Sequence, residues 1–334
     1  MHTRTISLGN LGFLVLLALL LPLSAAAASS SAAPSAISSV AANLSEPFAD
    51  VHADSSFFVA IKYLKDNKLI KGYADGTFQP RELITRAEAL AMILSLDDED
   101  DAQTGTEVLA TKKPFKDVSK KDWFYAVVAE GKMLGVVRGK GKLGRYFHPE
   151  DPVNLAEALR MLLKANDIET DTNGADAATT LPTNVPPDAW YANDITYGIS
   201  RSLLMQQVDA RSIDPAKRLT RGEFVLLLYR FLKTQDEARF GYASWYGDGL
   251  AKTKLTSGTE YAAKNLTAAN RTLPFGTIVR VTNLYNGKQV DVVINDRGPF
   301  VTGRIIDLSK TAFSALESPS SGVISVQVEV AKKQ

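Results

Sequence analysis

Cysteine is absent from all 334 residues of the chain. This absence excludes disulfide bonds, thiolate metal sites, a cysteine nucleophile and a lipid-modified N-terminal cysteine. Histidine is almost as rare, with three in total: His2, His52 and His148. So few histidines argue against a histidine-rich metal site and against a Ser-His-Asp triad. We therefore expect no metal and no other cofactor.

Long apolar runs are equally scarce, because only Leu11 to Leu23 approaches the length of a membrane helix. An apolar core of about 13 residues is too short to cross a bilayer, and basic Arg4 and the small residues 24–28 flank it. These features predict a cleavable secretory signal over residues 1–28. A flexible Ser/Ala-rich linker over 29–47 is expected to follow, with no membrane anchor left after cleavage.

Charge is nearly balanced, with a net charge of +1, and gives no sign of a nucleic-acid partner. From residue 239 onward, however, there are 12 Lys and Arg against 7 Asp and Glu. A basic domain suits attraction to anionic wall polymers. An ordinary solvated surface with a mild basic excess explains the count equally well.

From residue 48 the chain repeats with a period of about 65 to 70 residues. Phe48-Ala-Asp-Val51 recurs as Phe115-Lys-Asp-Val118, and an aromatic residue follows each copy. That aromatic residue opens a stretch with apolar side chains at helical spacing, and a turn then leads to a second predicted helix. We place three repeats at 48–96, 115–165 and 184–232, separated by an acidic linker at 97–114 and a second linker at 166–183.

Each second helix begins with a capping sequence: Thr85-Arg-Ala-Glu88, Asn154-Leu-Ala-Glu157 or Thr220-Arg-Gly-Glu223. In a capping box the two end residues satisfy backbone amides that the helix leaves unpaired. Capping does not explain the arginine at the second position, Arg86 or Arg221. We expect these arginines to be exposed and to hold an anionic sugar through bidentate hydrogen bonds.

These repeats resemble the S-layer homology family, most clearly through Gly72-Tyr-Ala-Asp-Gly-Thr-Phe-Gln-Pro80 and the Thr-Arg-Ala-Glu motif. The resemblance implies an all-α, pseudo-threefold module that binds pyruvylated secondary cell-wall polymer on a Gram-positive-type surface. Phe57 stands where the family usually has tryptophan, and Leu155 where it usually has arginine. The residues that the resemblance assigns to polymer binding are Arg86, Arg221, Trp123 and Trp190.

From Gly241 the pattern changes to short strands separated by Gly and Asn turns. About 95 residues of this kind, with one short helix at 309–316, are typical of a small all-β barrel. We place this domain at 239–332. The chain is therefore expected to be multidomain, with an all-α repeat module followed by an all-β barrel.

A hairpin in this domain carries the one pattern in the chain that suggests acid/base chemistry. Alternating apolar residues at 277–283 and 288–294 flank the dipeptide Asn286-Gly287, which is a strong hairpin signal. The second strand delivers Asp296 to a tight Arg-Gly-Pro turn. A carboxylate at a strand end, beside a glycine that lets substrate come close, is a common acid/base arrangement.

Four segments closely resemble the rare lipoprotein A (RlpA) family: Ala243-Ser-Trp-Tyr-Gly247, Thr267-Ala-Ala-Asn-Arg-Thr-Leu-Pro-Phe-Gly276, Asn295-Asp-Arg-Gly-Pro-Phe300 and Arg304-Ile-Ile-Asp-Leu-Ser309. The resemblance implies a double-psi β-barrel and, in active members, lytic transglycosylase action on peptidoglycan. One carboxylate suffices for that reaction: it protonates the glycosidic oxygen and then takes the proton of the muramoyl C6 hydroxyl. We assign both roles to Asp296. The alternative is that Asp296 has only a structural role and caps the Arg-Gly-Pro turn.

Four neighbouring residues are candidates for substrate binding, each with an alternative. Arg297 holds a muramoyl carboxylate or pairs with Asp307. Trp245 and Tyr246 form a platform for a sugar ring or pack in the core. Asp307 itself is more typical of the N-cap of the final helix than of a catalytic residue.

Two positions depart from active RlpA members, which have His at the position of Asn270 and Glu at the position of Thr259. Because an amide does not titrate, Asn270 is expected to bind substrate without sharing a proton with Asp296. Glu260 lies one residue from the expected carboxylate and, on a strand, points to the opposite face. A one-residue loop shift restores it to the site.

The sequence thus supports two functions for a secreted protein of the cell wall. The first is a wall-anchored endolytic lytic transglycosylase, a lyase that cleaves MurNAc–GlcNAc bonds to 1,6-anhydro products. The second is a barrel that binds peptidoglycan strands or loosens the wall without cutting. A third interpretation, a purely structural surface-layer component, leaves the barrel unexplained.

Overall fold

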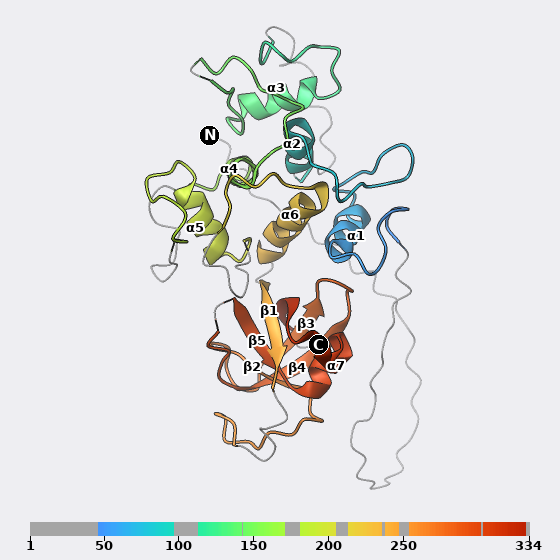
Figure 1. The fold of residues 1–334 in the computed structure, drawn as a ribbon, viewed down its shortest axis with the longest axis vertical. Helices are drawn as coiled ribbons and strands as arrows, with labels where there is room; N and C mark the ends of the chain where they lie inside the picture. Colours follow the sequence, from blue (N-terminus) through green and yellow to red (C-terminus); the bar gives the residue numbers. More distant parts are fainter. Residues whose placement is uncertain are drawn as a thin grey trace, which may run out of the picture.

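The computed structural model describes residues 46–96, 113–141, 143–170, 181–204, 213–235, 238–246, 254–301 and 303–331. The predicted signal sequence, residues 29–45 of the first linker and residues 97–112 of the acidic linker lie outside this part of the chain. The described residues form a helical N-terminal region followed by a barrel (Figure 1). None of their helices has both the length and the apolar character needed to cross a membrane.

The helical region contains a pair of helices from each expected repeat. In chain order they are α1 (Phe58–Asp66), α2 (Arg86–Leu94), α3 (Tyr125–Met133), α4 (Leu155–Ala165), α5 (Ala192–Ser200) and α6 (Arg221–Gln235). The first helix carries apolar side chains at helical spacing, as predicted, and Ala60, Ile61 and Leu64 among them are buried. Phe58, and not Phe57, is the fully buried aromatic residue that opens this helix.

The capping sequences act as predicted. Thr85 and Glu88 form a complete capping box at the start of α2. Asn154 caps α4 by accepting a hydrogen bond of 2.9 Å from the amide of Glu157. Thr220 and Glu223 bond each other's backbone amides at the start of α6. These contacts fix where each second helix begins.

The second helix of each pair packs on the first helix of the next pair: α2 on α3, α4 on α5, and α6 back on α1. Figure 1 shows α2, α4 and α6 near the centre of the region, with α1, α3 and α5 around them. Short bridges connect the segments that precede the central helices: Leu83 with Thr220, Thr85 with Pro152, and Asn154 with Arg218. One hydrophobic core runs through the whole region.

The C-terminal region is a closed six-stranded barrel with a helix against it. Its elements are β1 (Arg239–Trp245), β2 (Thr267–Ala269), β3 (Ile278–Asn283), β4 (Gln289–Asp296), β5 (Arg304–Leu308), α7 (Lys310–Leu316), the short 3-10 helix η3 (Pro319–Ser321) and β6 (Ile324–Val330). The strands lie in the order β1-β5-β2-β4-β3-β6 around the barrel. The β1–β5 and β2–β4 pairs are parallel and the others antiparallel. Closure removes the free strand edges that favour aggregation.

The predicted hairpin is confirmed as β3 and β4, with Val281 opposite Val290. The connection between these strands spans five residues, 284–288, and is longer than the Asn-Gly dipeptide alone. The predicted final helix is α7, and its N-cap is Ser309. Asp307 lies on β5, so the expectation that it caps this helix is wrong.

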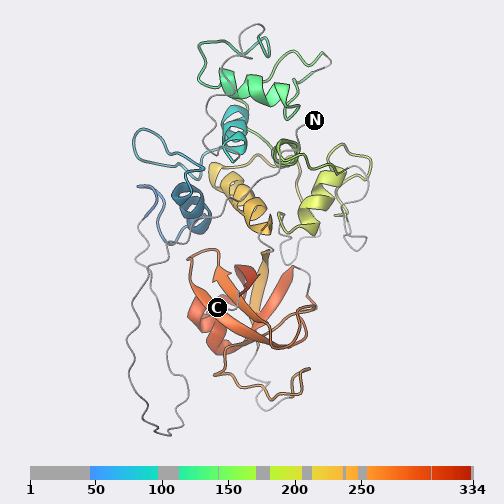
Figure 2. The ribbon, with the colours of Figure 1, turned by 180° about the vertical axis from the view of Figure 1, so that it is seen from behind.

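The barrel and the helical region share a buried junction. Phe240 at the start of β1 and Leu284 at the tip of the hairpin belong to the core of the helical region. Tyr229 on α6 donates a hydrogen bond to Gln327 on β6, and both side chains are about 3% exposed. Figure 2 shows α6 directly above β1, seen from behind. The site described next lies at the end of β1 and β4 that is remote from this junction.

Candidate functional site

One row of residues crosses three strand pairs of the barrel and carries both candidate carboxylates. Ala269 on β2 is paired with Asp296 on β4 and, on its other side, with Asp307 on β5. Asp307 is in turn paired with Ser244 on β1. Since neighbouring strands lie about 4.8 Å apart, the two aspartates stand roughly two strand spacings from each other. The fold thus places Asp296 and Asp307 in separate local environments.

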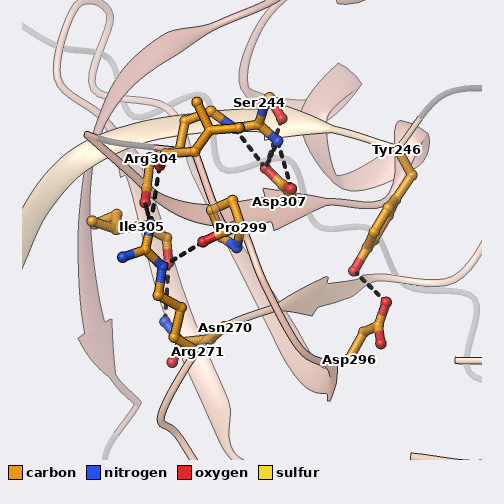
Figure 3. Close-up of polar contacts among 10 residues, drawn as sticks. Ser244, Tyr246, Asn270, Arg271, Asp296, Pro299, Arg304, Ile305 and Asp307 are labelled. Carbon is orange, nitrogen blue, oxygen red and sulfur yellow. Dashed lines mark hydrogen bonds and ion pairs between the residues drawn. The ribbon is translucent and has the colours of Figure 1, made fainter. Parts of the chain in front are cut away.

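Asp296 is held by hydrogen bonds to both carboxylate oxygens. Its Oδ1 accepts from the hydroxyl and the amide of Thr256, at 2.6 and 2.8 Å. Its Oδ2 accepts from the Tyr246 hydroxyl at 3.3 Å, a contact drawn in Figure 3. The side chain is only partly buried, so a substrate has access to it.

These hydrogen bonds set the charge of the Asp296 carboxyl. Burial raises its pKa, but the donors from Thr256, the Arg297 amide and Tyr246 favour the charged form and together lower the pKa below its ordinary value. Asp296 is therefore a carboxylate at neutral pH in this structure. It is ready to act as a base, whereas action as an acid requires the donors to leave.

Tyr246 remains a hydroxyl donor. Burial, and then the negative charge of Asp296, raises the pKa of its phenol above the ordinary value. Its ring packs edge-on against Tyr261, with 5.3 Å between the ring centroids. Trp245 contacts the barrel core, and its indole N–H donates to the carbonyl of Pro319 at 3.1 Å. The core-packing alternative thus describes Trp245, while Tyr246 orients Asp296.

The Asn270 side chain forms three hydrogen bonds, and Figure 3 draws the one to Ile305. Its Oδ1 accepts from the amides of Thr272 and Leu273, and its Nδ2 donates to the carbonyl of Ile305 at 3.0 Å. Only the backbone of Asn270 contacts the candidate acid, through a bond of 3.1 Å from its amide to the Asp296 carbonyl. Asn270 therefore shapes the turn beside Asp296.

Arg297 and Asp307 do not pair with each other, so that alternative is wrong. Arg297 donates to the carbonyls of Asn270 and Leu273, at 3.3 and 3.0 Å. Asp307 instead forms a bidentate ion pair with Arg304 and accepts a bond of 2.6 Å from the Ser244 hydroxyl. Figure 3 shows this cluster separate from the Tyr246–Asp296 pair.

Glu260 and Thr259 lie in the loop that follows β1, and neither is among the described residues that hydrogen-bond the Asp296 side chain. Glu260 is exposed, and the hydroxyl of Thr259 bonds that of Ser257 at 2.8 Å. The loop residue that does reach Asp296 is Thr256, which the sequence did not single out. The only feature of the sequence that could have pointed to Thr256 is its position just before the turn at Ser257-Gly258.

The expectation that Arg86 and Arg221 are exposed is wrong, because their exposed fractions are 5% and 4%. Arg86 donates to the carbonyl of Phe147 and pairs with Glu157 at 3.1 Å. Arg221 donates to the carbonyl of Phe78 and pairs with Glu88 at 3.0 Å. Each guanidinium thus reaches into another repeat and meets the glutamate of that repeat's capping sequence.

The two tryptophans of the repeats are exposed, Trp123 by 62% and Trp190 by 55%. The guanidinium of Arg160 lies over the Trp190 ring, 5.2 Å from its centroid, and pairs with the buried Asp194. Arg160 follows the cap of α4 by six residues, where the other two repeats have Ala91 and Leu226. The second repeat has Leu155 in place of the arginine, but it carries Arg160 on the same helix. The sequence patterns did not single out Arg160.

Among the described residues no group of His, Asp and Glu is arranged to hold a metal ion. A groove of about 840 Å³ lies between the first repeat and Tyr285 of the barrel, and Asp296 is not among the residues that line it.

Comparison with known proteins identifies both regions. Residues 238–328 match the family model of the lytic transglycolase domain, and residues 47–90 and 114–159 match that of the S-layer homology domain. The endolytic peptidoglycan transglycosylase RlpA of Campylobacter jejuni is 52% identical over 94 residues, which are 28% of this chain and 34% of that protein. A probable endolytic peptidoglycan transglycosylase RlpA of Synechocystis is 53% identical over 90 residues, 27% of this chain and 28% of that protein.

The chain therefore spans about a third or less of the length of these relatives. Among solved structures, the Streptomyces papain inhibitor is 25% identical with a TM-score of 0.24, covering 28% of this chain and 94% of the inhibitor. An expansin of Clavibacter michiganensis is 23% identical with a TM-score of 0.25, covering 29% and 52% of the two chains. The resemblance seen in the sequence is confirmed: the chain joins S-layer homology repeats to an RlpA-like double-psi β-barrel.

Proposed function

We propose that this chain is a wall-anchored, peptidoglycan-acting protein whose barrel is an endolytic lytic transglycosylase. The observation that carries the proposal is Asp296, a partly exposed carboxylate at the end of β4 that Thr256 and Tyr246 hold in place. The relatives that match this domain at about half identity are named as transglycosylases, which supports the same reaction.

In the proposed reaction Asp296 acts twice on the bond between MurNAc and GlcNAc. As an acid it protonates the glycosidic oxygen while the bond to the MurNAc C1 breaks. As a base it then takes the proton of the C6 hydroxyl, whose oxygen attacks C1. The product is a 1,6-anhydro end, no water is consumed, and the carboxyl group regains its proton for the next cycle.

The first step requires a protonated Asp296, which the free site disfavours. We propose that an entering glycan strand displaces Thr256 from Oδ1, so that the pKa of Asp296 rises in the complex. The hydroxyl of Tyr246 keeps the carboxyl oriented on its other oxygen. Arg297, which makes no ion pair among the described residues, is then available to a muramoyl carboxylate next to the site.

The alternative is a barrel that binds glycan or loosens the wall without cutting it. Two observations favour this alternative: the donors that keep Asp296 ionised, and the Asn270 side chain, which is committed to a turn and has no proton to share. In that case Asp296 acts only as a hydrogen-bond acceptor for the sugar.

Digestion of purified peptidoglycan separates the two functions. The full chain is incubated with sacculi, and the soluble products are analysed by mass spectrometry. The enzyme proposal expects 1,6-anhydro muropeptides from the natural chain and none from Asp296→Asn. Glycan binding without any anhydro product would support the binding function instead.

For the helical region we propose three S-layer homology repeats in a pseudo-threefold arrangement that binds an anionic, pyruvylated wall polymer. The second helix of each pair packs on the first helix of the following pair, and α6 packs back on α1. This cyclic packing supports a third repeat and a pseudo-threefold arrangement. The exposed Trp123 and Trp190 support the binding surface. Arg86 and Arg221 are buried and form ion pairs with another repeat. We therefore propose that their main role is to join the repeats, and that each exposes too little surface to make more than a small contact with the polymer.

The proposed division of the chain keeps the boundaries expected from the sequence, with a cleaved signal and export to the cell surface. Anchoring is tested with walls that either carry or lack the secondary polymer. Sedimentation of the chain only with the polymer-bearing walls supports the proposal, and equal sedimentation with both refutes it.

A further inference from the structure

Phe300 is the most exposed large apolar side chain in the described part of the protein, with 82% of its surface in water. It follows the Asp296 turn directly in the sequence. A phenyl ring left in water forfeits the stabilisation that burial would give, and contiguous exposed apolar surface commonly marks a binding site. Phe300 therefore calls for an explanation that the fold of the barrel does not supply.

The turn that carries Phe300 is firmly held. Gly298 and Pro299 are buried, and the Arg271 side chain donates to the carbonyls of Pro299 and Val301 on either side of Phe300. A charged side chain thus fixes the backbone on both sides of the exposed ring. The ring is presented by an ordered turn, and its exposure does not follow from a frayed chain end.

The ring lies beside the row that contains the candidate acid. A β-carbon placed on Gly298 would stand 3.8 Å from the Phe300 ring and 4.0 Å from the β-carbon of Ala269. Ala269 is the strand neighbour of Asp296. Phe275, 41% exposed, lies on the next turn, where the Arg297 guanidinium sits 3.7 Å from its ring centroid. Two aromatic rings thus flank the Asp296 turn.

We propose that Phe300 is a sugar-stacking residue of the Asp296 site and receives the flat face of a pyranose ring from a peptidoglycan strand. The C–H bonds on that face carry slight positive charge and pack against the negative face of an aromatic ring. The inference rests on the proposed function only in taking a glycan as the ligand. It does not require that the barrel cleaves this glycan. It also moves the stacking role away from Trp245, whose ring packs against the barrel core.

The test uses the full chain and peptidoglycan stripped of its secondary polymer, so that the repeats contribute no binding. Co-sedimentation gives the dissociation constant, and mass spectrometry of the same samples gives the anhydro products. Phe300→Ala is expected to weaken binding about tenfold, the equivalent of one good aromatic contact. Phe300→Leu, which is apolar but not flat, is expected to weaken it nearly as much, and Phe300→Trp to preserve it.

Tyr285→Ala is the matched control, because Tyr285 is an exposed aromatic residue (47%) at the opposite end of the hairpin. Unchanged binding by Phe300→Ala, or full binding by Phe300→Leu, would overturn the stacking role even if anhydro products appear. Binding that depends on Phe300 without any anhydro product from the natural chain would support the stacking role and refute the proposed catalysis. Failure of the natural chain to bind stripped peptidoglycan would overturn both.

Discussion

Thr256 donates two hydrogen bonds to one oxygen of Asp296, 2.6 Å from its hydroxyl and 2.8 Å from its amide. The two residues are 40 positions apart in the sequence and meet because the loop after β1 folds over the end of β4. The loop after β1 therefore supplies donors that favour the charged form of Asp296. The effect of Thr256 on the pKa of Asp296 can be tested without detecting any reaction product.

Replacement of Thr256 by valine is expected to raise the pKa of Asp296 towards its ordinary value, because the hydroxyl donor that favours the carboxylate is lost. The amide donor remains. The sign follows from linkage: a depressed pKa gives stability that is present above the ordinary value, near pH 4, and is lost as the pH falls through the folded value. Thr256→Val should therefore show less acid-induced loss of stability between pH 5 and 2, a window of about three units.

The carboxyl carbon shift of Asp296, followed by NMR titration, measures this pKa directly. Thr259→Val is the control, since its hydroxyl bonds Ser257 and not Asp296. The same titration midpoint in Thr256→Val and in the natural chain would show that the contact does not set the charge.

Arg221→Ala is expected to destabilise the helical region by about 3 kcal/mol, near the lower end of the cost of breaking a buried ion pair. Glu88 would lose its cationic partner, while it keeps hydrogen bonds from Tyr73 and Thr85. Urea unfolding followed by circular dichroism measures the change. Arg81→Ala, which removes an exposed arginine, should change stability by less than about 0.5 kcal/mol. A stable Arg221→Ala chain that no longer binds walls would instead assign Arg221 to the polymer.

Tyr229→Phe is expected to cost about 1–3 kcal/mol, because Gln327 keeps a buried oxygen without its donor. The loss should appear in the unfolding of both regions, since the bond joins α6 to β6. Tyr63→Phe is a matched control: the Tyr63 ring packs on Tyr229, and its hydroxyl makes no hydrogen bond among the described residues. If calorimetry shows the barrel unfolding unchanged in Tyr229→Phe, the junction does not couple the two regions.

Trp190→Ala is expected to weaken binding to polymer-bearing walls about tenfold, since it removes an exposed ring that already lies under the Arg160 guanidinium. Arg160→Lys should weaken binding less, because it keeps the charge but loses the planar fork. Leu143→Ala, an exposed apolar residue of the second repeat, serves as the control. Wall binding by Trp190→Ala equal to that of the natural chain would remove Trp190 from the binding surface.

Local signals in the sequence predicted much of this fold. The capping boxes at Thr85 and Thr220 and the β3–β4 hairpin depend on residues within a few positions of one another, and each is present. The barrel was predicted mainly through its resemblance to a known family, because a six-stranded order with two parallel pairs depends on contacts distant in sequence.

The environment of the site residues was less predictable, for the same physical reason. Arg221 is buried because Glu88, 133 positions away, lies opposite it once the repeats close on one another. Spacing along the chain gives no measure of that approach. Likewise Asp307 follows the pattern of a helix cap, yet Ser309 takes that place and leaves Asp307 to Arg304.

Digestion of peptidoglycan in water labelled with oxygen-18 shows whether Asp296 cleaves the glycan without using water. The expected result is 1,6-anhydro ends free of label from the natural chain and intact strands from Asp296→Asn. Labelled reducing ends would contradict the account by showing hydrolysis. Equal yields of anhydro ends from the two chains would contradict the assignment of Asp296.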